Sequence, residues 1–348
     1  EALRVEEIDG GRYVTALVRS EGRPATEVLQ AALPGLLAEI KLGKAMRWNA
    51  TNTAFSRPIR WLLALFGEIA IPFTYAGVVS GKSTYGLRPY GSPEAIVRDA
   101  SGYFAALSAQ GIYLSREDRR EIILDQIEAL AQRVEGSVPA DAALLDEVAN
   151  LVEAPTAFLG SFEEKYLALP RDVLVTVMRK HQRYFPVQDG RGKLLPYFIA
   201  VRNGDIEHLD KVIHGNEQVL RARFSDADYF YSQDIKKPLA EHLTRLATLT
   251  FQEKLGSMLD KNERVTGIIG ALGQLVGLSA TETGIAQRAA HLAKADLGTQ
   301  MVVELTSLQG IMGREYALRE GYPAEVAQAI AEHWQPRGAG DPIPASNA

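Results

Sequence analysis

The order of apolar and polar residues predicts a mixed N-terminal region. Residues 12–19 alternate between apolar and polar side chains as a strand does, and residues 25–40 repeat their apolar side chains with helical spacing. Residues 59–66 are apolar enough for a buried strand or a short helix, and residues 69–73 look like its partner. We therefore expect an α+β region over residues 1–90.

Residues 91–205 have the pattern of a second α+β module. Ser115 and Asp118 resemble a capping box, and the helix that follows should bury one face. That face carries Ile123, Ile127, Leu130 and Val134. A further helix is predicted over residues 141–152. Another should begin at residues 169–171 and run into the segment 178–187.

The segment 178–187, MRKHQRYFPV, combines a cationic helix end with an aromatic pair, and Pro186 rules out more helix. A tight turn over residues 189–192 and a returning strand over 194–201 should follow. Between residues 178 and 202 there are six Lys or Arg against one acid, with four aromatic rings among them. This mixture indicates a surface for a polyanion such as RNA. The alternative is a helix–hairpin unit whose aromatic rings belong to the core and whose charges are solvated.

From about Gly204 onward no convincing strand pattern appears, so we expect an all-helical domain over residues 206–336 and a linker or frayed tail over 337–348. Glycines recur every three or four residues within 265–281, which favours close packing by a neighbouring helix over a nucleotide loop. Ser279 and Glu282 should cap the next helix.

Composition narrows the function. With 348 residues the chain should form two or three domains, and its net charge of −5 restricts any nucleic-acid contact to local patches. The absence of cysteine excludes disulfides, thiolate zinc sites and a cysteine nucleophile, and it fits a reducing cytoplasm. The longest uncharged run, 265–281, is too short and too polar to span a membrane. We expect a cytoplasmic protein without membrane contact.

Motifs for independent catalysis are missing. The six histidines form no His-x-His or His-Glu-x-x-His pair, and neither a GxSxG elbow nor a GxxxxGK[ST] loop occurs. The sequence therefore predicts no catalytic residue and no metal site on this chain.

Nine segments, in this order, resemble the β subunit of the bacterial two-subunit glycyl-tRNA synthetase, an α2β2 tetramer. They are MRW at 46–48, FSRPIRW at 55–61, LVEAP at 151–155, LPRDVL at 169–174, MRKHQRYFPV at 178–187, VLRARFSDA at 219–227, KADL at 294–297, LQGIMG at 308–313 and AIAEH at 329–333. The resemblance covers about residues 41 to 336. Members of that family extend further at both ends and include a C-terminal anticodon-binding region, so the resemblance implies a fragment.

The resemblance implies an accessory subunit of glycine–tRNA ligase that binds tRNA-Gly and pairs with an α subunit. That α subunit uses ATP and Mg²⁺, which leaves no cofactor on this chain. It also implies a B3/B4-like α+β module at 91–205 and an HD-like helical domain after it. HD phosphohydrolases need a His-Asp dipeptide, which this sequence lacks. Lys294 stands near the expected metal position, which suggests a scaffold that lost hydrolysis and kept affinity for phosphates.

Two further departures concern the N-terminal region. Asn49 follows MRW where the family usually has Gly, and the loop 84–88 reads TYGLR in place of a TRGHR-type sequence. One cation and one imidazole are therefore missing from that loop.

We expect phosphate contacts from six cations and base stacking from one ring. These residues are Arg179, Lys180, Arg183, Arg221, Arg223 and Lys294, with Tyr184 as the ring. For Arg221 and Arg223 the alternative is ion pairing with Asp226 and Asp228. Three other functions stay open: an HD-type metal-dependent phosphohydrolase, a B3/B4-type editing deacylase, and a structural subunit with little RNA contact.

Overall fold

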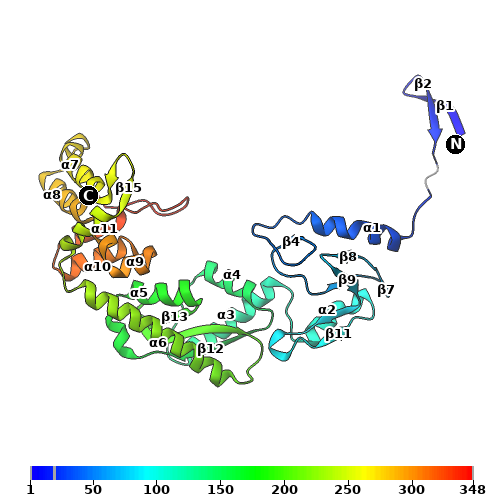
Figure 1. The fold of residues 1–348 in the computed structure, drawn as a ribbon, viewed down its shortest axis with the longest axis horizontal. Coiled ribbons are helices and arrows are strands. Elements are labelled where there is room, and N and C mark those ends of the chain that lie inside the picture. Colours follow the sequence, from blue (N-terminus) through cyan, green and yellow to red (C-terminus); the bar gives the residue numbers. More distant parts are fainter. Residues whose placement is uncertain (1, 19–20, 347–348) are drawn as a thin grey trace. The chain divides into compact units, whose positions relative to one another are not determined.

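The computed structural model describes residues 2–18 and 21–346 and divides into two compact units, residues 1–115 and 116–348 (Figure 1). None of the domain boundaries expected from the sequence, at 90/91, 205/206 and 336/337, coincides with this division. Residues 91–115 belong to unit 1 because strand β11 (Glu94–Ile96) pairs with β10 (Ser83–Tyr85).

In its described residues, unit 1 is built from short strands, two α-helices and two short 3-10 helices, Arg88–Tyr90 and Ala100–Gly102. The strands β1 (Ala2–Ile8) and β2 (Gly11–Leu17) form an antiparallel hairpin, and the helix α1 spans Ala25–Ala38. Both the strand predicted at 12–19 and the helix predicted at 25–40 are confirmed, although Arg19 lies outside the described residues. Two further strand pairs are β3 (Met46–Arg47) with β4 (Ala54–Phe55) and β6 (Leu65–Phe66) with β7 (Ile69–Ala70). A three-stranded sheet has the order β5 (Leu62–Leu63), β9 (Val78–Gly81) and β8 (Thr74–Tyr75). Helix α2 spans Tyr103–Ala109.

The apolar run 59–66 does not form one buried strand. It contains the two-residue strands β5 and β6, whose side chains are half-buried or exposed. Gly67, with φ +59°, turns the chain directly after β6 and lets β7 pair back on it, which confirms the predicted partner at 69–73. The buried core of unit 1 is small and includes Ile71, Leu87 and Val97.

Unit 2 contains an antiparallel three-stranded sheet in the order β12–β14–β13. Strand β12 spans Pro155–Ser161, β14 spans Leu194–Asn203 and β13 spans Phe185–Gln188. The predicted turn and returning strand are confirmed: Gly192 has φ +81°, and the Asp189 carboxylate accepts the backbone N–H groups of Arg191 and Lys193. Pro186 lies in the edge strand β13, where proline is tolerated.

The two faces of this sheet contribute to different cores. Side chains of successive residues in a strand point to opposite faces, so Ile199 packs with helices α3 (Arg116–Gln132) and α4 (Ala142–Leu151). Its neighbour Phe198 packs with α5 (Arg171–Thr176) and the 26-residue helix α6 (Leu209–Asp234), which Figure 1 shows running along the sheet. The predicted buried face of α3 and the predicted bounds of α4 are confirmed.

The core beside α6 continues into the helices that follow. These are a 3-10 helix (Leu239–Thr248), α7 (Met258–Leu275), α8 (Ala280–Leu292), a 3-10 turn (Ala295–Gly298), α9 (Gln300–Glu304), α10 (Ile311–Arg319) and α11 (Ala324–Glu332). Because Leu220 and Phe224 of α6 share this core with Met301 and Ile330, residues 116–348 form one unit.

The prediction that no strand follows Gly204 is wrong. A small hairpin pairs β15 (Thr250–Gln252) with β16 (Gly256–Ser257). The Gln252 side chain accepts the backbone N–H groups of Lys254 and Leu255, and Gly256 adopts φ +84°. All three residues of β15 are exposed, so no alternation between buried and exposed positions marked this strand in the sequence.

At the α7–α8 pair the predicted cap is confirmed, and the predicted glycine packing is confirmed for Gly270 and Gly273 but not for Gly267 and Gly277, which face open space. A Cβ atom on Gly273 would lie 2.8 Å from Thr283 Oγ1, so this glycine permits close approach of α8. The Ser279 hydroxyl accepts the backbone N–H of Glu282, whose carboxylate accepts the N–H of Ser279, which completes the capping box. In the described part of the chain, no helix combines the length and apolar character that crossing a bilayer requires.

Candidate nucleic-acid interface

The cationic segment lies where α5 changes into strand β13. Helix α5 continues as a π-helical turn over Val177–Gln182, and Arg183 then adopts the left-handed conformation with φ 58°. The backbone N–H of Tyr184 donates to Met178 O at 2.9 Å. Non-glycine residues at positive φ are uncommon, and π-helical turns occur often at functional sites. This geometry exposes Lys180, His181 and Arg183 around one helix end.

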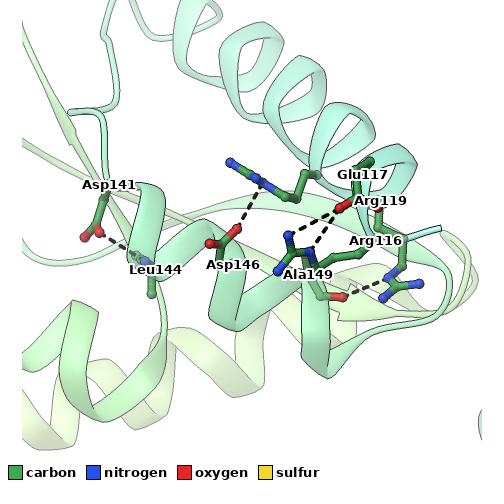
Figure 2. A network of polar contacts seen from close by, with 8 residues as sticks. Arg116, Glu117, Arg119, Asp141, Leu144, Asp146 and Ala149 are labelled. Carbon is green, nitrogen blue, oxygen red and sulfur yellow. Dashed lines mark hydrogen bonds and ion pairs between the residues drawn. The ribbon is translucent and has the colours of Figure 1, made fainter.

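Two of the predicted phosphate contacts are already held by carboxylates of unit 2. Arg179 pairs with Asp141, with one N–H···O distance of 2.8 Å, and Arg183 pairs with Glu147 at 2.8 Å. Asp141 also caps α4, because its carboxylate accepts the N–H of Leu144, as Figure 2 shows. Both arginines therefore join helix α4 to the cationic helix end.

Figure 2 also shows how α3 and α4 are joined by polar contacts. Arg119 donates to the carbonyl oxygen of Ala149 at 2.8 Å, a contact drawn in the figure. In addition, Arg120 of α3 pairs with Asp146 of α4 at 3.1 Å. These contacts hold α4 against α3 and so fix the positions of Asp141 and Glu147.

Tyr184 does not present its ring to the surface. Its ring stacks on Phe198 with centroids 4.6 Å apart, its hydroxyl donates to Asn216 Oδ1, and only 5% of the residue is exposed. The expectation of a base-stacking ring is therefore corrected: Tyr184 belongs to the core, as the alternative interpretation of this segment had it. Phe185 and Phe198 are buried as well.

The two arginines of α6 differ in their surroundings. Arg221 pairs with Glu163 at 3.2 Å, and not with Asp226 or Asp228 as considered from the sequence. Arg223 is exposed and, within the described residues, has no ion pair. It lines a cavity of about 170 Å³ together with His181, Asp226 and Glu304.

Four residues of unit 2 form what we call the basic cluster: Lys180, His181, Arg223 and Arg337. Burial lowers the pKa of Lys180, and the positive charges of Arg179 and Arg337 lower it further. Burial and then the charge of Arg223 lower the pKa of His181. These effects show positive charges close together. Within the described residues no ion pair neutralises Lys180, Arg223 or Arg337.

Arg337 was missed from the sequence because it lies in the Pro- and Gly-rich stretch predicted as a linker or frayed tail. In the structure its guanidinium donates to the carbonyl oxygens of Ser307, at 3.0 Å, and Gln309, at 2.8 Å. Asp341 accepts the N–H of Arg337, and Ser346 contacts the Glu332 carboxylate. The described tail residues are therefore bound to the helical part. No periodic pattern announced these contacts.

Lys294 is half-buried and lines a cavity with Ala329 and His333, at the end of α11. Its Nζ lies 3.4 Å from the ring centroid of Trp334, and burial together with Lys261 lowers the pKa of Lys294 to about 8. Lys261, Lys294 and His333 line a largely apolar cavity of about 190 Å³. Lys294 is thus more deeply buried than Lys180, whose residue is exposed.

Asp296 is fully buried two residues further on. Its Oδ2 accepts the N–H groups of Gly310 and Gly313, at 2.5 and 3.1 Å, whereas Oδ1 has no hydrogen-bond partner. Burial raises the pKa of this carboxyl to about 6. Burial also lowers the pKa of His333 to about 4. Across residues 2–18 and 21–346, no three His, Asp or Glu side chains gather in a way that could hold a metal ion.

Comparison with known proteins decides the family. The family model described as glycyl-tRNA synthetase beta subunit matches residues 1–348. The glycine–tRNA ligase beta subunit of Desulforamulus reducens is 46% identical over 344 residues, which are 99% of this chain and 50% of that protein. The chain belongs to the glycyl-tRNA synthetase β-subunit family.

Other relatives of this β-subunit family agree. The beta subunit of Moorella thermoacetica is 45% identical over 346 residues, 99% of this chain and 50% of that protein. The chloroplastic/mitochondrial glycine–tRNA ligase 2 of Arabidopsis thaliana is 46% identical over 336 residues, 97% of this chain and 31% of that protein. The chain thus spans about half the length of the bacterial relatives described here.

Proposed function

We propose that the chain is part of an accessory subunit of glycine–tRNA ligase that binds tRNA-Gly and holds it for glycylation by a separate α subunit. Family membership supports the ligase and both partners. In this proposal the α subunit uses ATP and Mg²⁺, and this chain contributes no reacting group. The single observation that carries the RNA contact is the basic cluster, whose cations have no ion pair within the described part of unit 2.

Unpaired cations suit this role because RNA binding is driven largely by phosphates that release their condensed counterions. Lys180, Arg223 and Arg337 can each meet a phosphate without first breaking an internal ion pair. Arg179, Arg183 and Arg221 would have to exchange a carboxylate for a phosphate. These half-exposed pairs are worth roughly 0–1 kcal/mol, so the exchange is feasible but gains less.

Holding the tRNA can matter greatly even without chemistry on this chain. Correct placement of two reacting groups contributes on the order of 7–11 kcal/mol to lowering a barrier at the limit. A subunit that fixes the tRNA relative to the partner's active site therefore raises the rate through geometry alone.

The proposal is tested by titrating fluorescent tRNA-Gly with the 348-residue chain at several salt concentrations. The double variant Lys180→Gln/Arg223→Gln should bind more weakly, and the slope of log K against log salt should flatten by about two units. The matched control is Lys254→Gln/Arg319→Gln, which removes two exposed cations from other elements of unit 2. Equal losses in the two double variants would mean that only net charge matters, and the basic cluster would lose its role.

A further inference from the structure

Residues 41–90 of unit 1 are strongly depleted of acids. They contain seven cations and one carboxylate, Glu68, although the whole chain has 43 acids against 38 Lys and Arg. The cations are Lys41, Lys44, Arg47, Arg57, Arg60, Lys82 and Arg88. A segment this basic within an acidic chain indicates a local surface for an anionic partner.

In the structure most of these cations are exposed to solvent and have no ion pair within the described residues of unit 1. Six of the seven cations are exposed, and Lys82 is half-buried. No ion pair is found among residues 2–18 and 21–115, whereas Arg179, Arg183, Arg221 and Arg314 of unit 2 all have one. Lys82 Nζ donates to the backbone carbonyl of Glu68 at 2.5 Å, and the Arg47 guanidinium donates to the carbonyl of Asn52. Carbonyl contacts orient these cations without neutralising them.

Two tryptophans lie among these cations in the sequence, and each makes contacts that orient its ring. Trp48 is 38% exposed, and its Nε1 donates to the carbonyl of Phe55 at 2.9 Å across the β3–β4 hairpin. Trp61 is 36% exposed, with its ring 4.8 Å from that of Tyr85 and the Arg60 guanidinium 5.7 Å from its centroid. Cations beside exposed, oriented rings are the combination that binds unpaired nucleotides.

We infer that residues 41–90 form a second RNA-binding surface, separate from the basic cluster, that grips phosphates and stacks an unpaired base on Trp48. Arg57 and Arg88 are the clearest phosphate contacts because no other side chain or backbone group of unit 1 engages their guanidinium groups in the described residues. Trp48 is the clearer stacking ring, since Arg60 and Tyr85 already flank Trp61.

An acidic protein surface is the competing partner. It would explain the cations, because protein interfaces commonly set a positive patch opposite a negative one. It would not call for exposed indole rings held by hydrogen bonds and ring contacts. The exposed rings therefore favour RNA.

The test compares two double variants of the 348-residue chain in titrations with tRNA-Gly at several salt concentrations. Arg57→Gln/Arg88→Gln should weaken binding and flatten the salt slope by about two units. Arg4→Gln/Arg12→Gln removes two exposed cations from the β1–β2 hairpin of the same unit and should leave both quantities nearly unchanged. Equal effects in both variants, or none in either, would overturn the inference.

Stacking is tested with a short single-stranded RNA and with a duplex of equal charge. Trp48→Leu should weaken binding of the single strand on the order of tenfold and affect the duplex little, whereas Trp48→Phe should keep most of the affinity. Thermal unfolding of each variant shows whether it is folded. Loss of duplex and single-strand binding to the same extent would argue against stacking.

The outcome separates this surface from the basic cluster. If Lys180→Gln/Arg223→Gln weakens tRNA binding and Arg57→Gln/Arg88→Gln does not, only the second surface fails. If Arg57→Gln/Arg88→Gln weakens tRNA binding and Lys180→Gln/Arg223→Gln does not, the second surface binds RNA and the proposed role of the basic cluster is wrong. If Arg57→Gln/Arg88→Gln leaves tRNA binding intact but abolishes binding of the α subunit, residues 41–90 are a protein-docking surface and the inference is wrong.

Discussion

Individual cations that look equivalent in the sequence differ in the structure. Arg179 and Lys180 are neighbours, yet Arg179 is paired with Asp141 and Lys180 has no ion pair within the described residues. Asp141 is 38 positions away from Arg179, and Glu147 is 36 positions away from Arg183. Ion pairs between residues so distant in sequence depend on the packing of α4, which local periodicity cannot reveal.

Tyr184 illustrates how one backbone conformation changes the role of a side chain. The sequence places an aromatic pair directly after a cationic helix end, which resembles a stacking surface. Arg183, at φ 58°, reverses the chain so that the Tyr184 ring faces Phe198 and its hydroxyl reaches Asn216. A positive φ at an arginine is uncommon and has no signal in the sequence.

The buried carboxyl of Asp296 leads to a pH-dependent prediction. Its pKa rises from the ordinary value of 3.8 to about 6, so the folded state favours the protonated form. Between about pH 4 and pH 6 the unfolded chain loses this proton while the folded protein keeps it, so the free energy of unfolding falls as the pH rises. Above pH 6 the loss is complete and amounts to roughly 3 kcal/mol. Asp296→Asn keeps an acceptor for Gly310 and Gly313 and removes the charge.

Urea unfolding at pH 4.5 to 7.5 measures this effect. Relative to the parent chain, Asp296→Asn should gain unfolding free energy as the pH rises to about 6 and then stay level. Because the pKa of His333 is lowered to about 4, this histidine makes the protein less stable as the pH falls. The effect is the same in both chains, so it cancels in the comparison. Asp228→Asn, an exposed change on α6, controls for the loss of one charge. A constant difference at every pH would contradict the prediction.

At the scale of elements, the glycines of α7 should differ sharply in their response to alanine. A Cβ at Gly273 would lie 2.8 Å from Thr283 Oγ1, and the branched side chain of Thr283 cannot move far, so Gly273→Ala should destabilise the α7–α8 pair by about 1–3 kcal/mol. At Gly267, apart from its chain neighbours and the backbone of its own helix, no heavy atom of the described residues lies within 4 Å of the same position. Gly267→Ala should therefore stabilise the helix by about 0.5–1 kcal/mol.

Chemical unfolding of the two variants provides the comparison, because the substitution is identical and lies in the same helix. Opposite signs are expected. Stabilisation by Gly273→Ala would show that the two helices have room between them, and that the close approach inferred from the glycine spacing is absent.

Helices with a cap or a one-sided apolar face were the elements that the sequence predicted best. Helix α3 buries Ile123 and Ile127 as its spacing indicated, and Ser279 begins α8 as its box with Glu282 indicated. The β15–β16 hairpin escaped prediction because its strands are too short to show alternation. The basic cluster was found only in part, since Arg337 reaches it through contacts with Ser307 and Gln309 that no local pattern encodes.

For the whole molecule, each of the two units carries one of the proposed basic surfaces, on a chain whose net charge is −5. The rest of the chain carries a net negative charge and repels RNA. An RNA that does not contact the basic surfaces should therefore bind poorly. Two weak contacts on one chain strengthen each other when a single RNA can reach both. If both surfaces bind the same tRNA, removing either one should weaken binding without abolishing it.

If this chain only positions tRNA, loss of the basic cluster should slow the tRNA-charging reaction and leave the activation of glycine by ATP unchanged. In the full-length β subunit combined with its α subunit, Lys180→Gln/Arg223→Gln should lower kcat/KM for tRNA by about tenfold or more, since each lost phosphate contact weakens tRNA binding. Glycine-dependent ATP–pyrophosphate exchange, which needs no tRNA, should be unchanged because we place the ATP and glycine sites on the α subunit. Lys254→Gln/Arg319→Gln should leave both reactions at the parent level. If the basic-cluster variant slows pyrophosphate exchange as strongly as tRNA charging, this chain shapes the partner's active site itself, and positioning of tRNA is no longer the explanation.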